Sequence, residues 1–121
     1  IVGGEACVGE RATRNLTPDA GASVEELLDG LVDRYFQVDC AIFTPNPDRP
    51  RHVEEMFHDY QANGVIHYSL NFCQPYLIES TPTAKNLQAK GIPVLSLETD
   101  YSAADAGQLK TRIQAFLEML K

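Results

Sequence analysis

Two short apolar stretches decide the fold: GVIHYSL at residues 64–70 and PVLSL at residues 93–97. Both are rich in β-branched or apolar residues, and each follows the end of an expected helix, which is typical of buried strands. Strands that alternate with helices favour right-handed crossovers and a parallel sheet covered on both faces. Ile1-Val2 is interpreted as the tail of a further strand. The chain is therefore predicted to be a single three-layer α/β domain over residues 1–121, with a small parallel sheet of three or four strands flanked by helices.

The first expected helix has a clear beginning in the sequence. Ser23 and Glu26 form a capping box, in which the serine oxygen and the glutamate carboxylate satisfy backbone amides at the helix start. Apolar residues then recur at helical spacing and predict one buried stripe, formed by Val24, Leu27, Leu28, Leu31, Val32 and Tyr35. Residues 38–43 are interpreted as a loop between helices, because Asp39 interrupts them and a proline-rich turn follows.

A second and a final helix are expected on similar grounds. The second begins after Asp48 and ends at Asn63-Gly64, where either residue can adopt the left-handed cap conformation. The final helix opens with Ser102 and Asp105 and places apolar residues on one side.

A third helix is expected between the two apolar stretches. It covers residues 81–90, with Pro82 tolerated in its first turn and Gly91 closing it. A separate, shorter helical turn is expected before it, over residues 76–79.

The composition narrows the class of protein. The 121 residues carry 10 basic and 17 acidic side chains, for a net charge of −7, which lacks the electrostatic footprint of a nucleic-acid or anionic-membrane binder. No apolar run approaches the length of a bilayer span. The odd number of cysteines, 3, with none in a CxxC motif, favours a reducing compartment, the cytoplasm, over a disulfide framework. The chain starts without Met and inside an expected strand, which favours excision from a longer polypeptide.

Residues able to carry chemistry follow each expected strand. Ligands bind outside the carboxyl ends of parallel strands, so these residues are expected to share one edge of the sheet. They are Glu5, Cys7 and Arg11 after the first strand, Cys73 and Gln74 after the second, and Glu98 after the third. Cys73 is the leading candidate for a metal ligand, because a nearby helix N-terminus would favour the thiolate. From the residues alone, a buried and inert thiol is the interpretation that is favoured over a metal ligand for Cys73, and equally for Cys7.

The remaining candidates point less clearly to chemistry. Cys40 and His67 are expected to pack, and Arg11 and Arg14 could either meet an acidic ligand or solvate a loop. No GxGxxG follows a strand, and neither a P-loop nor a GxSxG elbow is present, which argues against dinucleotide binding, nucleotide hydrolysis and serine hydrolase chemistry.

Several motifs in a fixed order resemble a known family. They are GEACVGER at 4–11, GVI at 64–66, NFCQP at 71–75 with Glu79, GIPVL at 91–95, ETDY at 98–101, GQL at 107–109 and TRIQAFLE at 111–118. Over nearly its whole length the chain resembles the 2-hydroxyacyl-CoA dehydratase family, of the 2-hydroxyglutaryl-CoA dehydratase D-component type. That family also contains benzoyl-CoA reductase subunits and double-cubane cluster proteins.

The resemblance implies part of an oxygen-sensitive iron–sulfur enzyme of anaerobic metabolism. Family members hold a [4Fe-4S] or larger cluster through cysteines from different domains of one subunit, and Cys73 stands at the position of the C-terminal cluster ligand. Cys7 matches a recurring motif position without an assigned role. An ATP-dependent activator protein injects a low-potential electron. In the dehydratases this electron reduces the 2-hydroxyacyl-CoA thioester to a ketyl radical and allows the hydroxyl to leave, whereas in the reductases it enters an aromatic ring.

The resemblance also implies partners and a longer parent. A sister subunit, the activator protein and an acyl-CoA substrate are expected. Family subunits are several times longer, so residues 1–121 are expected to be a C-terminal cluster-ligand domain that is inactive and lacks an intact [4Fe-4S] cluster on its own. An uncovered strand edge predicts that this fragment forms a homodimer. The alternative of another class is a non-catalytic α/β interaction domain that has lost the cluster; Cys73 in its motif context favours the enzyme.

Overall fold

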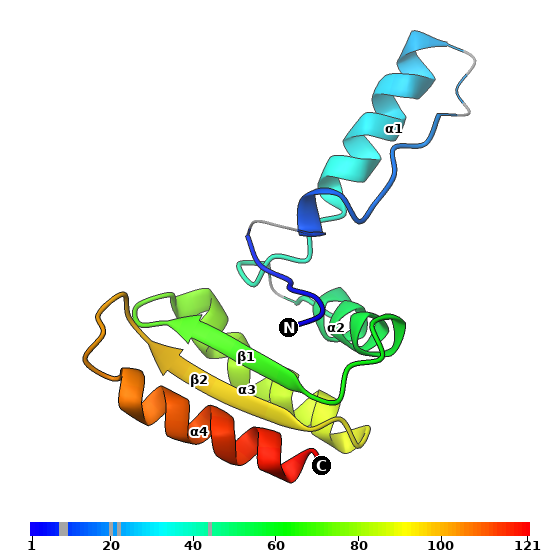
Figure 1. Cartoon of the computed structure of the whole chain (residues 1–121). Coiled ribbons are helices and arrows are strands. Elements are labelled where there is room, and N and C mark those ends of the chain that lie inside the picture. Colours follow the sequence, from blue (N-terminus) through cyan, green and yellow to red (C-terminus); the bar gives the residue numbers. More distant parts are fainter. Residues whose placement is uncertain (8–9, 20, 22, 44) are drawn as a thin grey trace. The chain divides into compact units, whose positions relative to one another are not determined.

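The computed structural model describes residues 1–7, 10–19, 21, 23–43 and 45–121. Within these ranges the chain forms two compact units, an N-terminal unit (Ile1–Cys40) and a C-terminal unit (Ala41–Lys121), whose elements are labelled in Figure 1.

The N-terminal unit contains a short 3-10 helix, η1 (Glu10–Ala12), and one α-helix, α1 (Val24–Phe36). The predicted capping box of α1 is confirmed. The Glu26 amide donates to the Ser23 hydroxyl at 3.2 Å, and the Ser23 amide donates to the Glu26 carboxylate at 3.0 Å. Two of the amides at the helix start are thereby satisfied, which explains why α1 begins where the sequence predicts.

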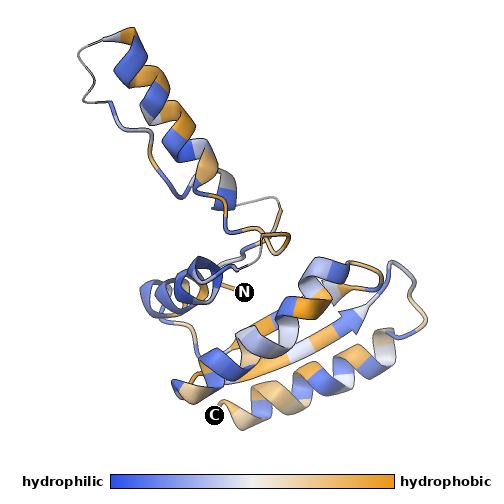
Figure 2. Cartoon of the chain, turned by 180° about the vertical axis from the view of Figure 1, so that it is seen from behind, coloured by the Kyte–Doolittle hydropathy of each residue, from blue (hydrophilic) through white to orange (hydrophobic). Residues whose placement is uncertain are grey.

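The predicted burial of the α1 stripe is wrong. All six of its residues are exposed, from 40% for Leu27 and Leu31 to 74% for Val24, and Figure 2 shows the apolar residues along one side of the helix. The helix is covered instead along its Gly30 side, where a Cβ would lie 3.1 Å from the Pro18 carbonyl oxygen. Helical periodicity predicts which side chains share a face, but whether that face is covered depends on another element of the fold.

The C-terminal unit is built on two parallel strands, β1 (Val65–Leu70) and β2 (Val94–Thr99), in register from Val65 with Val94 to Leu70 with Thr99. Both predicted strands and their parallel arrangement are confirmed. The sheet of the described residues has two strands rather than three or four. The predicted further strand at Ile1-Val2 is wrong: neither residue is in a strand, and both are exposed. A strand needs a neighbouring strand for its backbone hydrogen bonds, and the described residues provide none here.

Helices cover both faces of this small sheet, so the α/β class and the layered arrangement are confirmed for the C-terminal unit. Figure 1 shows β1 and β2 between α3 (Gln74–Ala89) and α4 (Ala106–Met119). The buried apolar side chains of the unit come from both helices, from β2 and from the connecting segments: Ala41, Leu87, Ile92, Leu97 and Phe116. Gly64 lies directly under α4, because a Cβ there would be 2.8 Å from the Phe116 ring.

Two helix boundaries differ from those predicted. Helix α2 (Asp48–Asp59) ends earlier than expected, and the left-handed residue beyond it is Gln61 (φ 49°) instead of Asn63 or Gly64. Helix α3 is continuous through Pro82, so the predicted break between a short turn and a longer helix is wrong. A proline removes one backbone hydrogen bond, but the packing of α3 against both strands and α2 maintains the helix.

The end of α3 follows the sequence closely. Gly91 has φ 79°, its amide donates to the Gln88 carbonyl, and the Ile92 amide donates to the Leu87 carbonyl. This pair of bonds is the Schellman arrangement, in which a left-handed glycine turns the chain out of the helix. The loop predicted over residues 38–43 is also confirmed. None of the helices in the described ranges is long and apolar enough to cross a membrane.

Candidate functional site at the carboxyl edge of the sheet

Cys73 lies where the polypeptide leaves β1 and enters α3. It is the N-cap residue of α3, and its thiol is free and partly exposed. The Cys73 amide donates to the Leu70 carbonyl at 3.0 Å, and its carbonyl accepts from the Leu77 amide at 3.0 Å. The backbone on both sides of the thiol is therefore fixed, which matches the predicted position beside a helix N-terminus.

The residue before the cysteine has an unusual backbone conformation. Phe72 has φ 69°, in the left-handed region that bulky side chains rarely adopt, and its side chain is 88% exposed. Such a conformation costs on the order of 1–3 kcal/mol and persists only where the surroundings impose it. Here the neighbouring hydrogen bonds do so: the Asn71 amide donates to the Thr99 carbonyl at 2.7 Å, and the Gln74 amide donates to the Phe72 carbonyl at 3.0 Å.

Glu98 and Gln74 are found at the same edge as Cys73. Glu98 is the fifth residue of β2, it pairs in register with Ser69, and its side chain is exposed. Gln74 is the first residue of α3 and is also exposed. The parallel strands thus bring Cys73, Gln74 and Glu98 to one carboxyl edge of the sheet. Cys7 belongs to the other unit, so its presence at this edge stays a prediction.

A polar groove runs along β2 in the C-terminal unit. Its cavity volume is about 370 Å³, and its wall combines hydroxyl groups, two leucines, one acid and one base: Ser69, Leu77, Ser80, Thr81, Ser96, Leu97, Glu98 and Arg112. Arg112 donates to the Ser96 carbonyl at 2.7 Å and so occupies an acceptor at the outer edge of the strand. Cys73 is not part of the groove wall, which separates the thiol from this surface.

Hydrogen bonds from Ser102 affect an acid just beyond β2. The Ser102 side chain, and then its backbone amide at 2.6 Å, lower the pKa of the exposed Asp100. This pairing forms a small turn between β2 and α4 and keeps Asp100 in its charged form.

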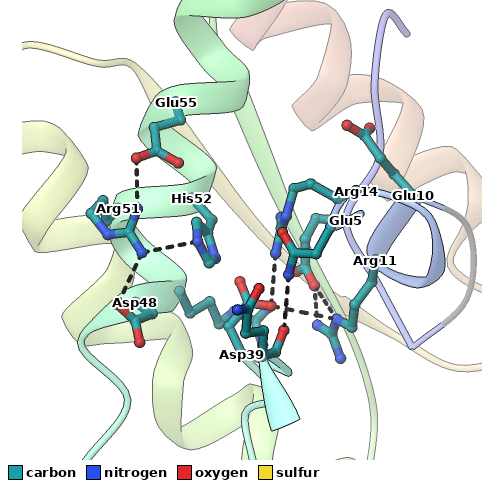
Figure 3. A network of polar contacts seen from close by, with 12 residues as sticks. Glu5, Glu10, Arg11, Arg14, Asp39, Asp48, Arg51, His52 and Glu55 are labelled. Atoms are coloured by element: carbon teal, nitrogen blue, oxygen red, sulfur yellow. Dashed lines mark hydrogen bonds and ion pairs between the residues drawn. The ribbon is translucent and has the colours of Figure 1, made fainter. Parts of the chain in front are cut away.

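The remaining predicted site residues form a buried charge cluster in the N-terminal unit (Figure 3). Arg11 binds the Glu5 carboxylate, and Arg14 binds Asp39 at 2.9 Å. The Asp39 side chain is only 1% exposed. The predicted role of Arg11 and Arg14 as solvated loop residues is wrong, because both side chains are largely buried and pair with acids of their own unit, and the alternative of an acidic ligand stays a prediction. Cys7 is a free, exposed thiol.

A second buried charge cluster, which the sequence analysis missed, connects α2 to α3. Arg49 is 3% exposed, its guanidinium lies 4.1 Å from the centroid of the Tyr76 ring, and its Nη1 is 3.3 Å from Glu79. Asn46 donates to the other Glu79 oxygen at 3.1 Å.

His67 packs as predicted, buried in β1 with its ring centroid 6.2 Å from that of Tyr76. The only signal for this cluster was Glu79 within the family motifs.

Among the described residues, the edge that carries Cys73 offers one cysteine as a possible metal ligand. Across the residues that the structure describes, no group of three or more His, Cys, Asp and Glu side chains is arranged to hold a metal ion. Cys73 contributes a single accessible thiol, whereas a [4Fe-4S] cluster takes about four thiolates. The sheet edge therefore offers one cysteine ligand and, among the described residues, could not hold such a cluster alone.

The fold and this edge define a class: an α/β unit with an accessible cysteine at the carboxyl end of a parallel strand. The comparison with known families is specific. The chain belongs to the 2-hydroxyglutaryl-CoA dehydratase D-component family, whose model matches residues 1–120.

Several known proteins are similar to this chain over all or most of its length. Over 99% of the chain it is 37% identical to a protein of Escherichia coli K12 named as a dehydratase subunit, YjiM. Over 99% it is 31% identical to the (R)-phenyllactyl-CoA dehydratase beta subunit of Clostridium sporogenes. Over 89% it is 26% identical to subunit beta of (R)-2-hydroxyglutaryl-CoA dehydratase from Acidaminococcus fermentans. The chain spans only 30%, 31% and 30% of these three relatives.

Proposed function

We propose that the chain is the C-terminal, cluster-ligand domain of a longer 2-hydroxyacyl-CoA dehydratase subunit of the cytoplasm, and that Cys73 binds a [4Fe-4S] cluster. The observation that carries the proposal is the family match over residues 1–120, together with relatives that are named as subunits of acyl-CoA dehydratases. These names favour a dehydratase over the benzoyl-CoA reductase and double-cubane alternatives.

The structure supports Cys73 as one thiolate of such a cluster. Its thiol is accessible, it stands at the N-terminus of a 16-residue helix, and its backbone is fixed by hydrogen bonds on both sides. A helix N-terminus favours negative charge, which suits a thiolate ligand. The remaining ligands come from other parts of the parent, and Cys7 is a secondary candidate.

When bound, the cluster would supply the low-potential electron with which the family removes the hydroxyl of a 2-hydroxyacyl-CoA thioester. Loss of water is redox-neutral overall, so the reaction as a whole consumes no electron. The chain itself orients one ligand at Cys73, while Gln74 and Glu98 provide polar groups at the same edge of the sheet. Hydrogen bonds around such a cluster tune its potential.

The partners follow from the same proposal. The relatives named as beta subunits support a sister subunit, and an ATP-dependent activator and an acyl-CoA complete the expected set. On its own, the 121-residue chain is expected to form a homodimer, because β1 has no neighbouring strand on its outer side among the described residues. Light scattering coupled to size exclusion tests this, and a monomer over a wide concentration range would contradict it.

The central experiment is anaerobic purification of the full-length parent with measurement of iron and sulfide. We expect a brown protein whose iron content and dehydratase activity fall strongly in Cys73→Ala. Cys40→Ala is the matched control, since Cys40 is a partly buried thiol in the loop after α1 and not at the end of a strand, and it should behave like the unmodified protein. A parent without iron would favour the alternative of a non-catalytic interaction domain. Unchanged iron in Cys73→Ala would remove the ligand assignment.

A further inference from the structure

Arg49 is the least expected buried group in the C-terminal unit. It is the second residue of α2, and its side chain is 4% exposed. Arginine is almost never this buried unless it is paired, because removing a guanidinium from water is costly. Its neighbour on the same helix shows the ordinary case: Arg51 is 53% exposed and pairs with Asp48 and Glu55 on the helix surface (Figure 3).

The groups that hold Arg49 belong to the start of α3. Its guanidinium stacks over the ring of Tyr76 at 4.1 Å and pairs with Glu79 at 3.3 Å. Tyr76 and Glu79 lie one and two helical turns beyond Cys73, on the helix for which Cys73 is the N-cap. The Asn46 amide binds the second oxygen of Glu79, so the carboxylate is held from two directions. Arg49 thus connects α2 to the part of α3 that carries the thiol.

The same contacts continue to the strand before Cys73. The Tyr76 ring lies beside the buried His67 ring, whose Nδ1 is 3.3 Å from the Ser69 hydroxyl. His67 and Ser69 belong to β1, which ends three residues before Cys73. The cluster therefore reaches the backbone on both sides of the strained Phe72–Cys73 turn.

We infer that Arg49 is a positioning residue, which fixes the start of α3 and thereby the orientation and accessibility of the Cys73 thiol. Its relevance to a cluster rests on the proposed function, whereas its effect on the thiol does not. The planar guanidinium suits this role, because one face stacks on Tyr76 while the charged group forms an ion pair with Glu79 at 3.3 Å. A lysine ammonium keeps the charge but has no planar face to stack on the ring.

The test measures the alkylation rate of one thiol at a time in the 121-residue chain. In a Cys7→Ser, Cys40→Ser background, iodoacetamide reports on Cys73 alone. A second reporter carries Cys73→Ser and Thr83→Cys, which places the thiol at a buried position in the middle of α3. Comparison of the two reporters separates loosening at the start of α3 from general destabilisation of the unit.

We expect Arg49→Ala to increase the alkylation rate of Cys73 by about threefold, because the thiol is already partly exposed and local opening of the first turns of α3 removes only its remaining cover. The thiol of the Thr83→Cys reporter should accelerate only by the factor that the measured loss of unfolding free energy predicts, because a buried thiol in the middle of α3 reacts only when the unit unfolds. Arg49→Lys should restore only part of the protection. Arg51→Ala, the matched control on α2, should leave both rates unchanged.

Two results would overturn the inference. Equal acceleration of both thiols would show that Arg49 only stabilises the unit as a whole, and an unchanged rate at Cys73 would show that it does not act on the thiol. The proposed function fails separately, if Cys73→Ala in the full-length parent keeps its iron while the contrast between the two reporters holds.

Discussion

The two units of this chain are stabilised by different forces. In the N-terminal unit, the buried residues among those described are Gly30 and the charged Asp39, and an apolar stripe on α1 lies exposed. In the C-terminal unit, apolar side chains from β2 and both covering helices are buried together, and its buried charged residue, Arg49, lies beside this core. Burial of apolar surface is non-directional and tolerates small shifts, whereas a buried ion pair depends on each partner. The two units should therefore respond differently to the loss of one side chain.

The largest effect is expected at the apolar core of the C-terminal unit. Phe116 is 6% exposed on α4, and Phe116→Ala should lower the free energy of unfolding by about 3–5 kcal/mol, the range for a buried phenylalanine. Urea unfolding followed by circular dichroism measures this value. Leu117→Ala, at the adjacent but 52% exposed position, should cost less than about 1 kcal/mol. Similar losses in both variants would mean that α4 does not cover the sheet as described.

The next largest effect is expected at the charge cluster of the N-terminal unit. Asp39→Asn keeps the size of the side chain but leaves Arg14 without its carboxylate, and loss of one partner of a buried pair costs about 3 kcal/mol. Hydrogen exchange at the amides of η1 and α1 measures the local loss. The control is Asp33→Asn on the exposed part of α1, which should exchange like the unmodified chain. Protection unchanged in Asp39→Asn would show that the cluster does not stabilise this unit.

The local structure of both units could be predicted from the sequence, whereas features that depend on tertiary packing could not. The β-branched stretches at 64–70 and 93–97, the capping box at Ser23 and the closing Gly91 each depend on local rules, and the structure has all of them. Continuity of α3 through Pro82 depends on tertiary packing, which local propensity does not contain.

The candidate site divides in the same way. The position of Cys73 at the end of β1 follows from the order of strand and helix, so it could be predicted. The pairing of Arg49 with Tyr76 and Glu79 joins residues about thirty positions apart, and a charged residue in the first turn of α2 looks like an ordinary solvated side chain. Long-range pairs of this kind have no periodic signature.

A smaller effect should come from the close approach of the sheet to α4. Gly64→Ala places a methyl group 2.8 Å from the Phe116 ring and 3.0 Å from Leu120, and such overpacking costs about 1–2 kcal/mol. Gly107→Ala meets nothing within 4 Å near the start of α4, so it should instead stabilise by about 0.5–1 kcal/mol. Thermal unfolding of the two variants should therefore shift in opposite directions. Stabilisation by both would show that α4 lies farther from the sheet.

The smallest effect is expected at Asp100, an exposed acid. Ser102→Ala removes the side-chain hydrogen bond that lowers the pKa of Asp100 most, so this pKa should rise toward its ordinary value, while the backbone bond keeps part of the shift. A lowered pKa in the folded state contributes stability above the unfolded pKa and loses it as the pH falls through the folded value. The stability difference between the two proteins should therefore be present at neutral pH and vanish in acid. An NMR titration of the Asp100 carboxyl measures the shift, and Ser102→Thr should restore it.

The hydrogen bond from Arg112 to the Ser96 carbonyl makes the two edges of the sheet unequal as sites for the addition of another strand. An arginine on the outer edge of β2 occupies an acceptor that an incoming strand would need, so among the strands of the described residues β1 is the edge better suited to extension. If two copies pair through their β1 strands around a two-fold axis, both β1 edges are buried and no further copy can add there. A head-to-tail contact between β1 of one copy and β2 of the next would instead propagate into a filament. The hydrogen bond of Arg112 therefore disfavours the head-to-tail contact relative to pairing of two β1 edges.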